Sequence, residues 1–388
     1  MSDFIKPVPQ EPADKGSHRR QWLLWGMIVL AALLIFSIIL LTCTNVFDGL
    51  FRSVRYIGKR DSDYGKVTFD GYGVTDHALV DDSLVVAGHG GLTVYKEKGS
   101  VAGKLQRDIS APKLMGQKDA LLVYDVGGTY LGVLDEGGIV SWEITTPGKI
   151  LDADFGETGY VSVLFSGVDA RSTLEVYNED GNLIYRRNAK SHYLNACSIS
   201  PNGRYVVATA LGQEDLSFVT TAEIYPTGTE EVAAKIPLGS QIIYDLAFTD
   251  DETVCAIGQQ AVRFFSVDGE LLGEYEPESG EIAAYSFDGD DFVVLAEELF
   301  QTGKRYRVIA VENDGTIRGS LQTEETPLHI SANQEYASVI TAQNIYIYND
   351  RMELQHKTEN EEAYIRALVR KDGTVLLVGS GAAELYIP

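Results

Sequence analysis

A short phrase recurs along this chain, in which apolar and polar residues alternate on both sides of a turn. Alternation with a period of two residues is typical of β-strands that are buried on one face. An Asp-Gly pair between two such runs favours a hairpin with a type I′ turn, which needs positive φ at both central residues. The phrase is written as VYKEKGSVAGKL from Val94, VYNEDGNLIYRR from Val176, FFSVDGELLGEY from Phe264, AVENDGTIRGSL from Ala310 and YIYNDRMELQHK from Tyr346. The chain is therefore expected to consist of repeated β-hairpins.

The hairpin turns are spaced at a nearly constant interval of about 40 residues, which is typical of propeller repeats. They fall near Gly99, Gly138, Gly181, Gly228, Gly269, Gly315 and Met352. No stretch shows a sustained helical period, and the short strands are rich in Val, Tyr, Phe and Ile. A second phrase occupies the same place in four of the repeats. It reads SPNGRYVVA from Ser200, TDDETVCAI from Thr249, ANQEYASVI from Ala332 and KDGTVLLVG from Lys371. These repeats predict the four-stranded blades of an all-β propeller.

The repeats divide residues 66–388 into eight expected blades. Seven of them cover residues 74–109, 111–147, 150–190, 193–239, 242–279, 282–325 and 327–360. The last unit, residues 364–388, has three strands, and we expect the segment from Lys66 to Asp70 to supply the fourth. Pairing both chain ends in one sheet would remove an exposed edge. Seven blades are the alternative if two units are one, whereas a pair of β-sandwiches would leave the period unexplained.

An uncharged apolar segment precedes the repeats. From Trp22 to Cys43 it reads WLLWGMIVLAALLIFSIILLTC, which as a helix is long enough to cross a hydrocarbon core of about 30 Å. We therefore expect a transmembrane helix over residues 21–44, a disordered cytoplasmic tail over 1–20 and a linker over 45–65. A cleaved signal peptide would have a shorter apolar core and an A-x-A site. A lipoprotein box ending at Cys43 would need a small residue where Thr42 stands.

The charges beside this segment do not by themselves fix its orientation. Four basic residues precede it and four follow it, namely Lys6, Lys15, Arg19 and Arg20, then Arg52, Arg55, Lys59 and Arg60. The adjacent Arg19 and Arg20, and the action of a first span as a signal anchor, favour a cytoplasmic N-terminus. The sequence thus predicts a single-pass protein of the cell membrane with an extracytoplasmic propeller.

A short tail, one apolar span and SPNGRYVV-type repeats together resemble the uncharacterised membrane-anchored propeller proteins of Gram-positive bacteria. The SPNGR element also resembles blades of TolB-like and WD40-like propellers, although the Trp-Asp pair of true WD40 blades is missing. The resemblance covers a few residues in each blade and implies the fold. It implies no activity, because propellers with such blades serve unrelated functions.

Composition and motifs argue against several classes of function. The chain has 32 Lys and Arg against 56 Asp and Glu, a formal charge of -24, which disfavours nucleic acid because phosphate binding needs clustered basic residues. Its three cysteines, Cys43, Cys197 and Cys255, do not form a disulfide framework. The sequence contains no CxxC, HExxH, GxSxG or phosphate-binding GxxxxGK(S/T) motif. We expect no metal, no cofactor and no catalytic residue.

Five residues are candidates for a binding site at the mouth of the central channel. Four inner strands share one register when aligned as His77–Val80, Asp152–Phe155, Asp245–Phe248 and Arg366–Val369. The first residue of each is expected at the rim, and His89 falls in a loop of the same face. Loops on a rigid scaffold are free to carry function. The alternative is that all five are solvated residues of the channel wall.

Three functions remain compatible with the sequence. The first, which we favour, is a protein-binding scaffold of the cell envelope, because a membrane anchor raises the effective concentration of another envelope protein. The second is a cell-surface sensor of a glycan or small ligand. A sugar could stack on the rings of the tyrosines near inner-strand starts, Tyr193, Tyr244, Tyr285 and Tyr364. The third, an enzyme with a rim site, is disfavoured by the lack of a nucleophile–base pair or metal cluster.

Overall fold

The structure is a computed structural model, which describes Trp25 and residues 66–388 apart from 72, 118, 215–216, 230, 279–280, 288, 290, 302, 334 and 371. The chain divides into two compact units, Met1–Ile57 and Gly58–Pro388. The expected tail, membrane span and linker lie outside the described residues, except for Trp25, which is helical. Within the described part of the chain, no helix has the length and apolar character needed to cross a membrane.

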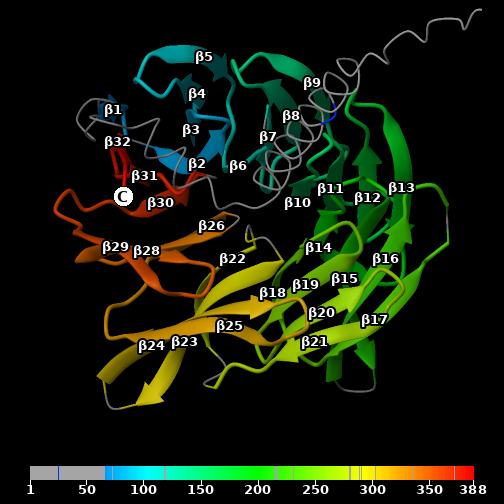
Figure 1. The fold of residues 1–388 in the computed structure, drawn as a ribbon. Coiled ribbons are helices and arrows are strands. Elements are labelled where there is room, and N and C mark those ends of the chain that lie inside the picture. The colour runs from blue at the N-terminus through cyan, green and yellow to red at the C-terminus, as the bar shows by residue number, and fades with distance from the viewer. Residues whose placement is uncertain are drawn as a thin grey trace, which may run out of the picture. The chain divides into compact units, whose positions relative to one another are not determined.

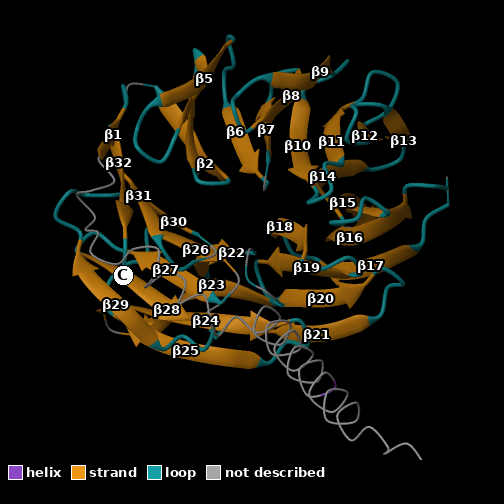
Figure 2. Ribbon diagram, turned by 45° about the horizontal axis from the view of Figure 1, so that its top comes forward, coloured by secondary structure: helices purple, strands orange, loops and turns teal. Residues whose placement is uncertain are grey.

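Residues 66–388 form eight four-stranded antiparallel sheets arranged around a central axis (Figures 1 and 2). The innermost strands of blades 1 to 8 are β2 (Val74–Val80), β6 (Pro112–Gly116), β10 (Ile150–Phe155), β14 (Tyr193–Ile199), β18 (Ile243–Phe248), β22 (Ile282–Ser286), β26 (His329–Asn333) and β30 (Arg366–Val369). The second strands are β3 (Ser83–Gly88), β7 (Ala120–Asp125), β11 (Val161–Ser166), β15 (Tyr205–Glu214), β19 (Thr253–Gly258), β23 (Phe292–Gln301), β27 (Tyr336–Ile340) and β31 (Val375–Val378).

The third and outermost strands complete each blade. The third strands are β4 (Gly91–Tyr95), β8 (Tyr130–Asp135), β12 (Ser172–Tyr177), β16 (Ser217–Pro226), β20 (Val262–Ser266), β24 (Gly303–Glu312), β28 (Asn344–Asn349) and β32 (Ala382–Tyr386). The outermost are β5 (Val101–Gln106), β9 (Val140–Thr145), β13 (Leu183–Ala189), β17 (Ala234–Gly239), β21 (Leu271–Tyr275), β25 (Ile317–Thr323), β29 (Leu354–Glu359) and, in blade 8, β1 (Lys66–Thr68). The predicted propeller of eight four-stranded blades is confirmed.

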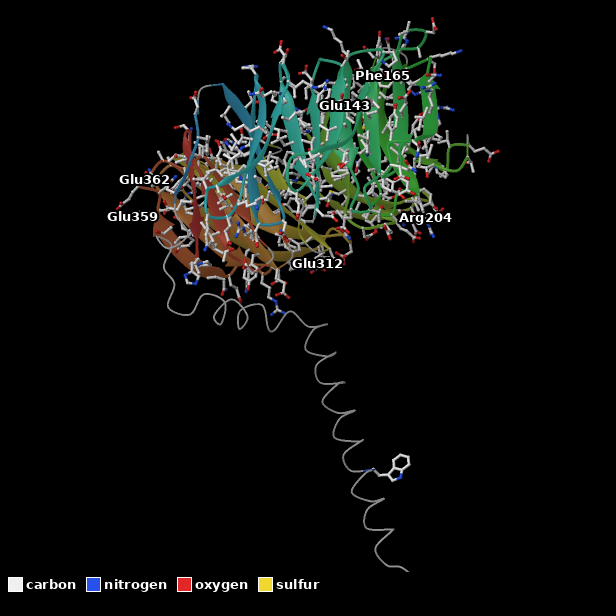
Figure 3. The ribbon with its side chains drawn as sticks, turned by 90° about the horizontal axis from the view of Figure 1, so that it is seen from above. Glu143, Phe165, Arg204, Glu312, Glu359 and Glu362 are labelled. Atoms are coloured by element: carbon white, nitrogen blue, oxygen red, sulfur yellow. The ribbon has the colours of Figure 1, made fainter. Side chains whose placement is uncertain are left out.

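The eighth blade closes the ring by joining the two ends of the propeller. β1 pairs with β32 in antiparallel register, so the segment from Lys66 supplies the missing strand as expected. Val67 of β1 is 4% exposed and belongs to a cluster that contains Leu84 of blade 1 and Val378 of blade 8. Lys66 also forms a 2.7 Å ion pair with Glu362, which is labelled at the outer edge in Figure 3.

The turns before the outermost strands differ from the predicted type I′ turns. In blade 1 the Gly99 N–H donates to the Lys96 carbonyl at 2.7 Å and the Lys96 N–H donates to the Ser100 carbonyl at 2.8 Å. Only the last turn residue has positive φ, at 82° for Gly99 and at 59° for Met352 in blade 7. This is a type I turn followed by a left-handed bulge residue. The prediction was wrong because this loop needs one left-handed residue, whereas a type I′ turn needs two.

The path of the chain gives the propeller two different faces. On the entry face the chain enters each innermost strand and turns from the second strand to the third. On the exit face lie the hairpins between innermost and second strands and the turns to outermost strands. Figure 3 labels Phe165, near the entry-face end of β11, and Arg204, on an exit-face hairpin, toward opposite sides of the propeller. Between the faces, strands such as β11 and β12 are buried along almost their whole length.

Candidate functional site

The polar residues of the channel wall are positioned by β-bulges in the innermost strands. A bulge interrupts the pairing of β2, β10 and β18 immediately before Asp76, Asp152 and Asp245. Because a bulge adds one residue to its strand, these three aspartates hold equivalent positions. The predicted register, which gave that position in blade 1 to His77, is therefore wrong by one residue.

Asp152 lies in the channel wall and is largely shielded from water. Its carboxylate accepts hydrogen bonds from the Tyr124 hydroxyl at 3.2 Å and from the Cys197 N–H at 3.0 Å. The Lys113 ammonium lies 3.9 Å from its Oδ1. Burial raises the pKa of Asp152 to about 6, although the charge of Lys113 opposes the rise. The fold thus retains this carboxylate against a desolvation cost.

Asp245, in the innermost strand of blade 5, interacts electrostatically with Asp152 and with Lys113. It accepts hydrogen bonds from the Leu246 N–H at 2.9 Å and from the Tyr285 hydroxyl at 3.2 Å. Burial raises the pKa of Asp245 as well, and the charges of Lys113 and Asp154 act on it in opposite directions. We call Asp152, Asp154 and Asp245 the acidic group of the channel wall. Their charges interact with one another and with the charge of Lys113.

Arg366 belongs to a different group, at the seam between blades 8 and 1. Its guanidinium forms a 2.6 Å ion pair with Asp76. His77 is 8% exposed, and its two ring nitrogens have no hydrogen-bond partner among the described residues. Burial, assisted by the charge of Arg366, lowers the pKa of His77 to about 4. His77 is thus a neutral side chain whose ring centroid lies 5.8 Å from that of Phe69, and it is not solvated.

His89 stands in the exposed turn between β3 and β4, whereas the other four predicted residues lie on innermost strands. It borders a cleft of about 830 Å³ that Phe69, Tyr95 and Lys104 also line. This cleft lies between blades 8 and 1, where β1 has only 3 residues and β5 has 6. Among the described residues, Thr68, Phe69 and Asp70 from the closing segment line this cleft together with residues of β3, β4 and β5.

The structure therefore divides the five predicted residues between two places. Asp152 and Asp245 share the acidic group, whereas Arg366, His77 and His89 lie where blades 8 and 1 meet, with Phe69 in contact with His77 and also lining the cleft that His89 borders. Among the residues that the structure describes, no cluster of three or more His, Cys, Asp or Glu could hold a metal ion. Whether any of the five binds a ligand stays a prediction.

Several polar residues of the channel wall also connect neighbouring blades. The Leu114 N–H donates to Asp76 at 2.9 Å, and the Ile199 N–H donates to Asp154 at 2.9 Å. In the same way Ser198, Ser286 and Ser331 accept from backbone N–H groups of the next blade. The innermost strand is an edge strand, so its inward N–H groups need such partners. Sequence reasoning missed these residues, because an isolated Asp or Ser in a strand carries no signal of a partner in the next repeat.

The exposed large apolar side chains of the propeller form two sets. One set lies on the entry face and consists of Val126, Leu151, Val168, Tyr193, Leu211, Phe218, Ile242, Tyr244, Leu328 and Ile365. The other lies at the beginnings of outermost strands and consists of Val101, Ile139, Leu183, Ile184, Leu271, Leu272, Ile317 and Leu354. Among the described residues, none lies on a hairpin between an innermost and a second strand. The apolar surface near the channel is therefore on the entry face.

The sequence of residues 68–384 matches the profile of a family of unknown function. The chain belongs to the DUF5711 family. No curated protein matches the sequence of this DUF5711 chain.

Two solved structures show the same fold as the DUF5711 propeller. The C-terminal WD40 domain of Sif2 superposes with a TM-score of 0.61 at 12% identity, covering 84% of this chain and 97% of that domain. BamB from Moraxella catarrhalis superposes with a TM-score of 0.54 at 14% identity, covering 83% of this chain and 98% of that one. At such low identity the likeness extends to the fold alone.

Proposed function

We propose that this DUF5711 chain is a protein-binding scaffold of the cell envelope. Its apolar N-terminal segment holds it in the membrane, its tail is cytoplasmic, and its propeller lies outside and binds another envelope protein. The observation that carries the proposal is the apolar set of the entry face. Monomeric proteins rarely expose large apolar patches unless these bind a partner.

Near the channel, the two faces of the propeller differ in a way that supports this proposal. Ile242 and Leu328, at the beginnings of inner strands, are 55% and 50% exposed. The exit-face hairpins carry acidic side chains instead, and a small cavity of about 330 Å³ there is lined by Glu157, Asp250 and Asp251 among others. Aromatic and aliphatic side chains form the energetic centre of protein interfaces, and charged side chains are depleted there.

The test is crosslinking in intact cells, followed by affinity capture and mass spectrometry, with the N-terminal segment alone as the control. A double variant, Ile242→Ser with Leu328→Ser, is expected to lower recovery of a specific partner. The matched control is Val101→Ser with Leu354→Ser, whose side chains are 50% and 54% exposed on outermost strands. Equal recovery with both variants, or recovery of background proteins alone from well-expressed cells, would contradict the proposal.

A second candidate function is binding of a glycan or small ligand in the seam cleft. The cleft of about 830 Å³ has the size of a ligand site and combines the rings of Phe69 and Tyr95 with the polar groups of His89 and Lys104. A screen of wall glycans and small metabolites by thermal shift tests it, because a bound ligand raises the unfolding temperature. A ligand of this cleft would stabilise the wild type and not the Lys104→Ala variant.

A further inference from the structure

One hairpin on the entry face extends beyond its blade. β15 and β16 each have 10 residues, whereas β14 and β17 have 7 and 6. Past the last pairs with β14 and β17, the two strands stay paired from Gly212↔Val219 to Glu214↔Ser217. We call this extension the arm. Among the described residues, the pairings of β14 and β17 end before these pairs begin.

One face of the arm points toward blade 5. Paired residues lie on the same side of a sheet and alternate along each strand, so Tyr193, Leu211 and Phe218 share a side. Thr220 lies on that side as well, and its hydroxyl donates to the Gln241 carbonyl, just before blade 5, at 2.7 Å. Deeper along the same side, the strands join the apolar core between blades 4 and 5.

This side of the arm continues into an exposed apolar surface. Tyr193, Leu211 and Phe218 are 52%, 37% and 46% exposed, and Ile242 and Tyr244 at the start of blade 5 are 55% and 45% exposed. We call these five residues the apolar patch. Three of the five are aromatic, and aromatic side chains are enriched at the energetic centres of protein interfaces.

The apolar patch borders the acidic group of the channel wall. Tyr244 is followed directly by Asp245, whose charge acts together with those of Asp152 and Asp154. Two cations lie nearby: Lys113, at 3.9 Å from Asp152, and Arg171 of blade 3, whose guanidinium lies 4.8 Å from the ring centroid of Tyr193 at the blade 4 end of the patch. The formal charge of the whole chain is -24. A partner segment that covers the patch therefore meets negative potential at its channel end, and a Lys or Arg side chain there is the complementary group.

We infer that the apolar patch binds an exposed segment of a protein partner that carries aliphatic or aromatic side chains followed by a lysine or arginine. The apolar side chains pack on Leu211, Phe218 and Tyr244, and the cation lies over the carboxylates of Asp245 and Asp152. This inference rests on the proposed scaffold function and names the surface and the chemistry of the partner.

A second extended hairpin supplies an internal control. β23 and β24 also have 10 residues each and project from blade 6 on the entry face. Leu299 in that hairpin is 5% exposed, and Arg305 forms a 3.4 Å ion pair with Glu324. Lys304 is exposed. The two hairpins have the same length and face, so a difference between them reports on the apolar patch.

The experiment is site-specific photo-crosslinking of the full chain in the cells that produce it. In separate variants a photoreactive phenylalanine analogue replaces Phe218, Leu328 elsewhere on the entry face, or Lys304 as the control, and the crosslinked peptide is sequenced. We expect a crosslink from position 218 and none from position 304, to a peptide with apolar residues next to Lys or Arg. A synthetic copy of that peptide should bind the Asp245→Asn variant about tenfold more weakly than the wild type, the effect of losing one charge pair.

Asparagine at position 245 can still accept both hydrogen bonds, and an unchanged unfolding temperature checks that the variant is folded. A crosslinked peptide without a basic residue, or equal affinity for the variant, overturns the inference about partner chemistry. Crosslinks to a glycan or to a second copy of this chain overturn it as well. Crosslinks that arise only at Lys304 or at Leu328 refute the patch but leave the scaffold function standing. Absence of crosslinks from every entry-face position refutes both.

Discussion

Replacing Asp152 by asparagine tests whether the channel wall holds its carboxylates at a cost. The side chain of Asp152 is 18% exposed, and burial raises its pKa from 3.8 to about 6. The folded chain thus binds this proton more tightly than the unfolded chain does. Protonated Asp152 favours folding at low pH, and this advantage is lost as the pH rises from about 4 to about 6.

The size of the effect follows from that pKa difference. About two pK units correspond to about 3 kcal/mol over the full titration, of which about 2 kcal/mol falls between about pH 4.5 and about pH 7.5. Asparagine does not titrate, but its amide oxygen can still accept from the Cys197 N–H that is now 3.0 Å from the carboxylate. The variant should therefore gain stability relative to the wild type as the pH rises.

The assay is urea unfolding of the purified chain at a series of pH values, with the free energy of unfolding compared between variant and wild type at each pH. Asp314→Asn is the control, because hydrogen bonds from Thr316 lower the pKa of this fully exposed carboxyl. Its difference from the wild type should be nearly flat between about pH 4.5 and about pH 7.5, because a lowered pKa contributes fully above the ordinary value, and should have the opposite slope only below about pH 4. A difference for Asp152→Asn that is flat with pH, or that falls as the pH rises, would refute the account of the channel wall.

Three further predictions concern the packing of the propeller. Gly315→Ala should destabilise the chain by about 1–3 kcal/mol because its φ is 81° and an added Cβ would lie 2.6 Å from a backbone nitrogen, whereas Gly228→Ala, with open space around it, should change little in urea unfolding. Arg307→Met should lower the free energy of unfolding by about 3–5 kcal/mol, because it leaves the fully buried carboxylate of Glu297, now 3.5 Å from Arg307, without this cation. A loss below about 1 kcal/mol in urea unfolding would contradict this. Burial raises the pKa of Cys197 and of Cys255 well above the ordinary value, so in a Cys43→Ser chain both thiols should react with Ellman's reagent only on unfolding, and rapid reaction of that folded chain would show the core to be open.

Much of the fold could be predicted from the sequence because each blade repeats its own local signals. Turn residues such as Gly99 and Gly269 stand at a regular spacing, and the hairpin phrase from Ser200 has counterparts in other blades. The segment from Lys66 could be assigned to the last blade because that unit had three strands and an unpaired edge. These inferences depend on neighbours in sequence, or on a count of strands.

The candidate site was predicted less well, and the reason lies in single-residue shifts. The strands β2, β10 and β18 share this bulge, but β2 has five residues from Asp76 to its end at Val80, whereas β10 and β18 have four from their aspartates. Alignment on the strand ends therefore put His77 in the place of Asp76. His89 was expected near the rim, and it borders a cleft that the sequence did not indicate. The importance of Lys113 also escaped notice, because its partners come from blades that are distant in sequence.

The sequence by itself determined the repeat and the way in which the ring closes, and it favoured eight blades over seven, since hairpins and their spacing are encoded within each repeat. Only the tertiary structure decided which polar groups share the channel and which apolar residues stay uncovered. Those relations join blade 3 to blade 5 across the channel, and the arm of blade 4 to the start of blade 5. They depend on how sheets pack around an axis, and side chains that meet in this way can be separated by any number of residues along the chain.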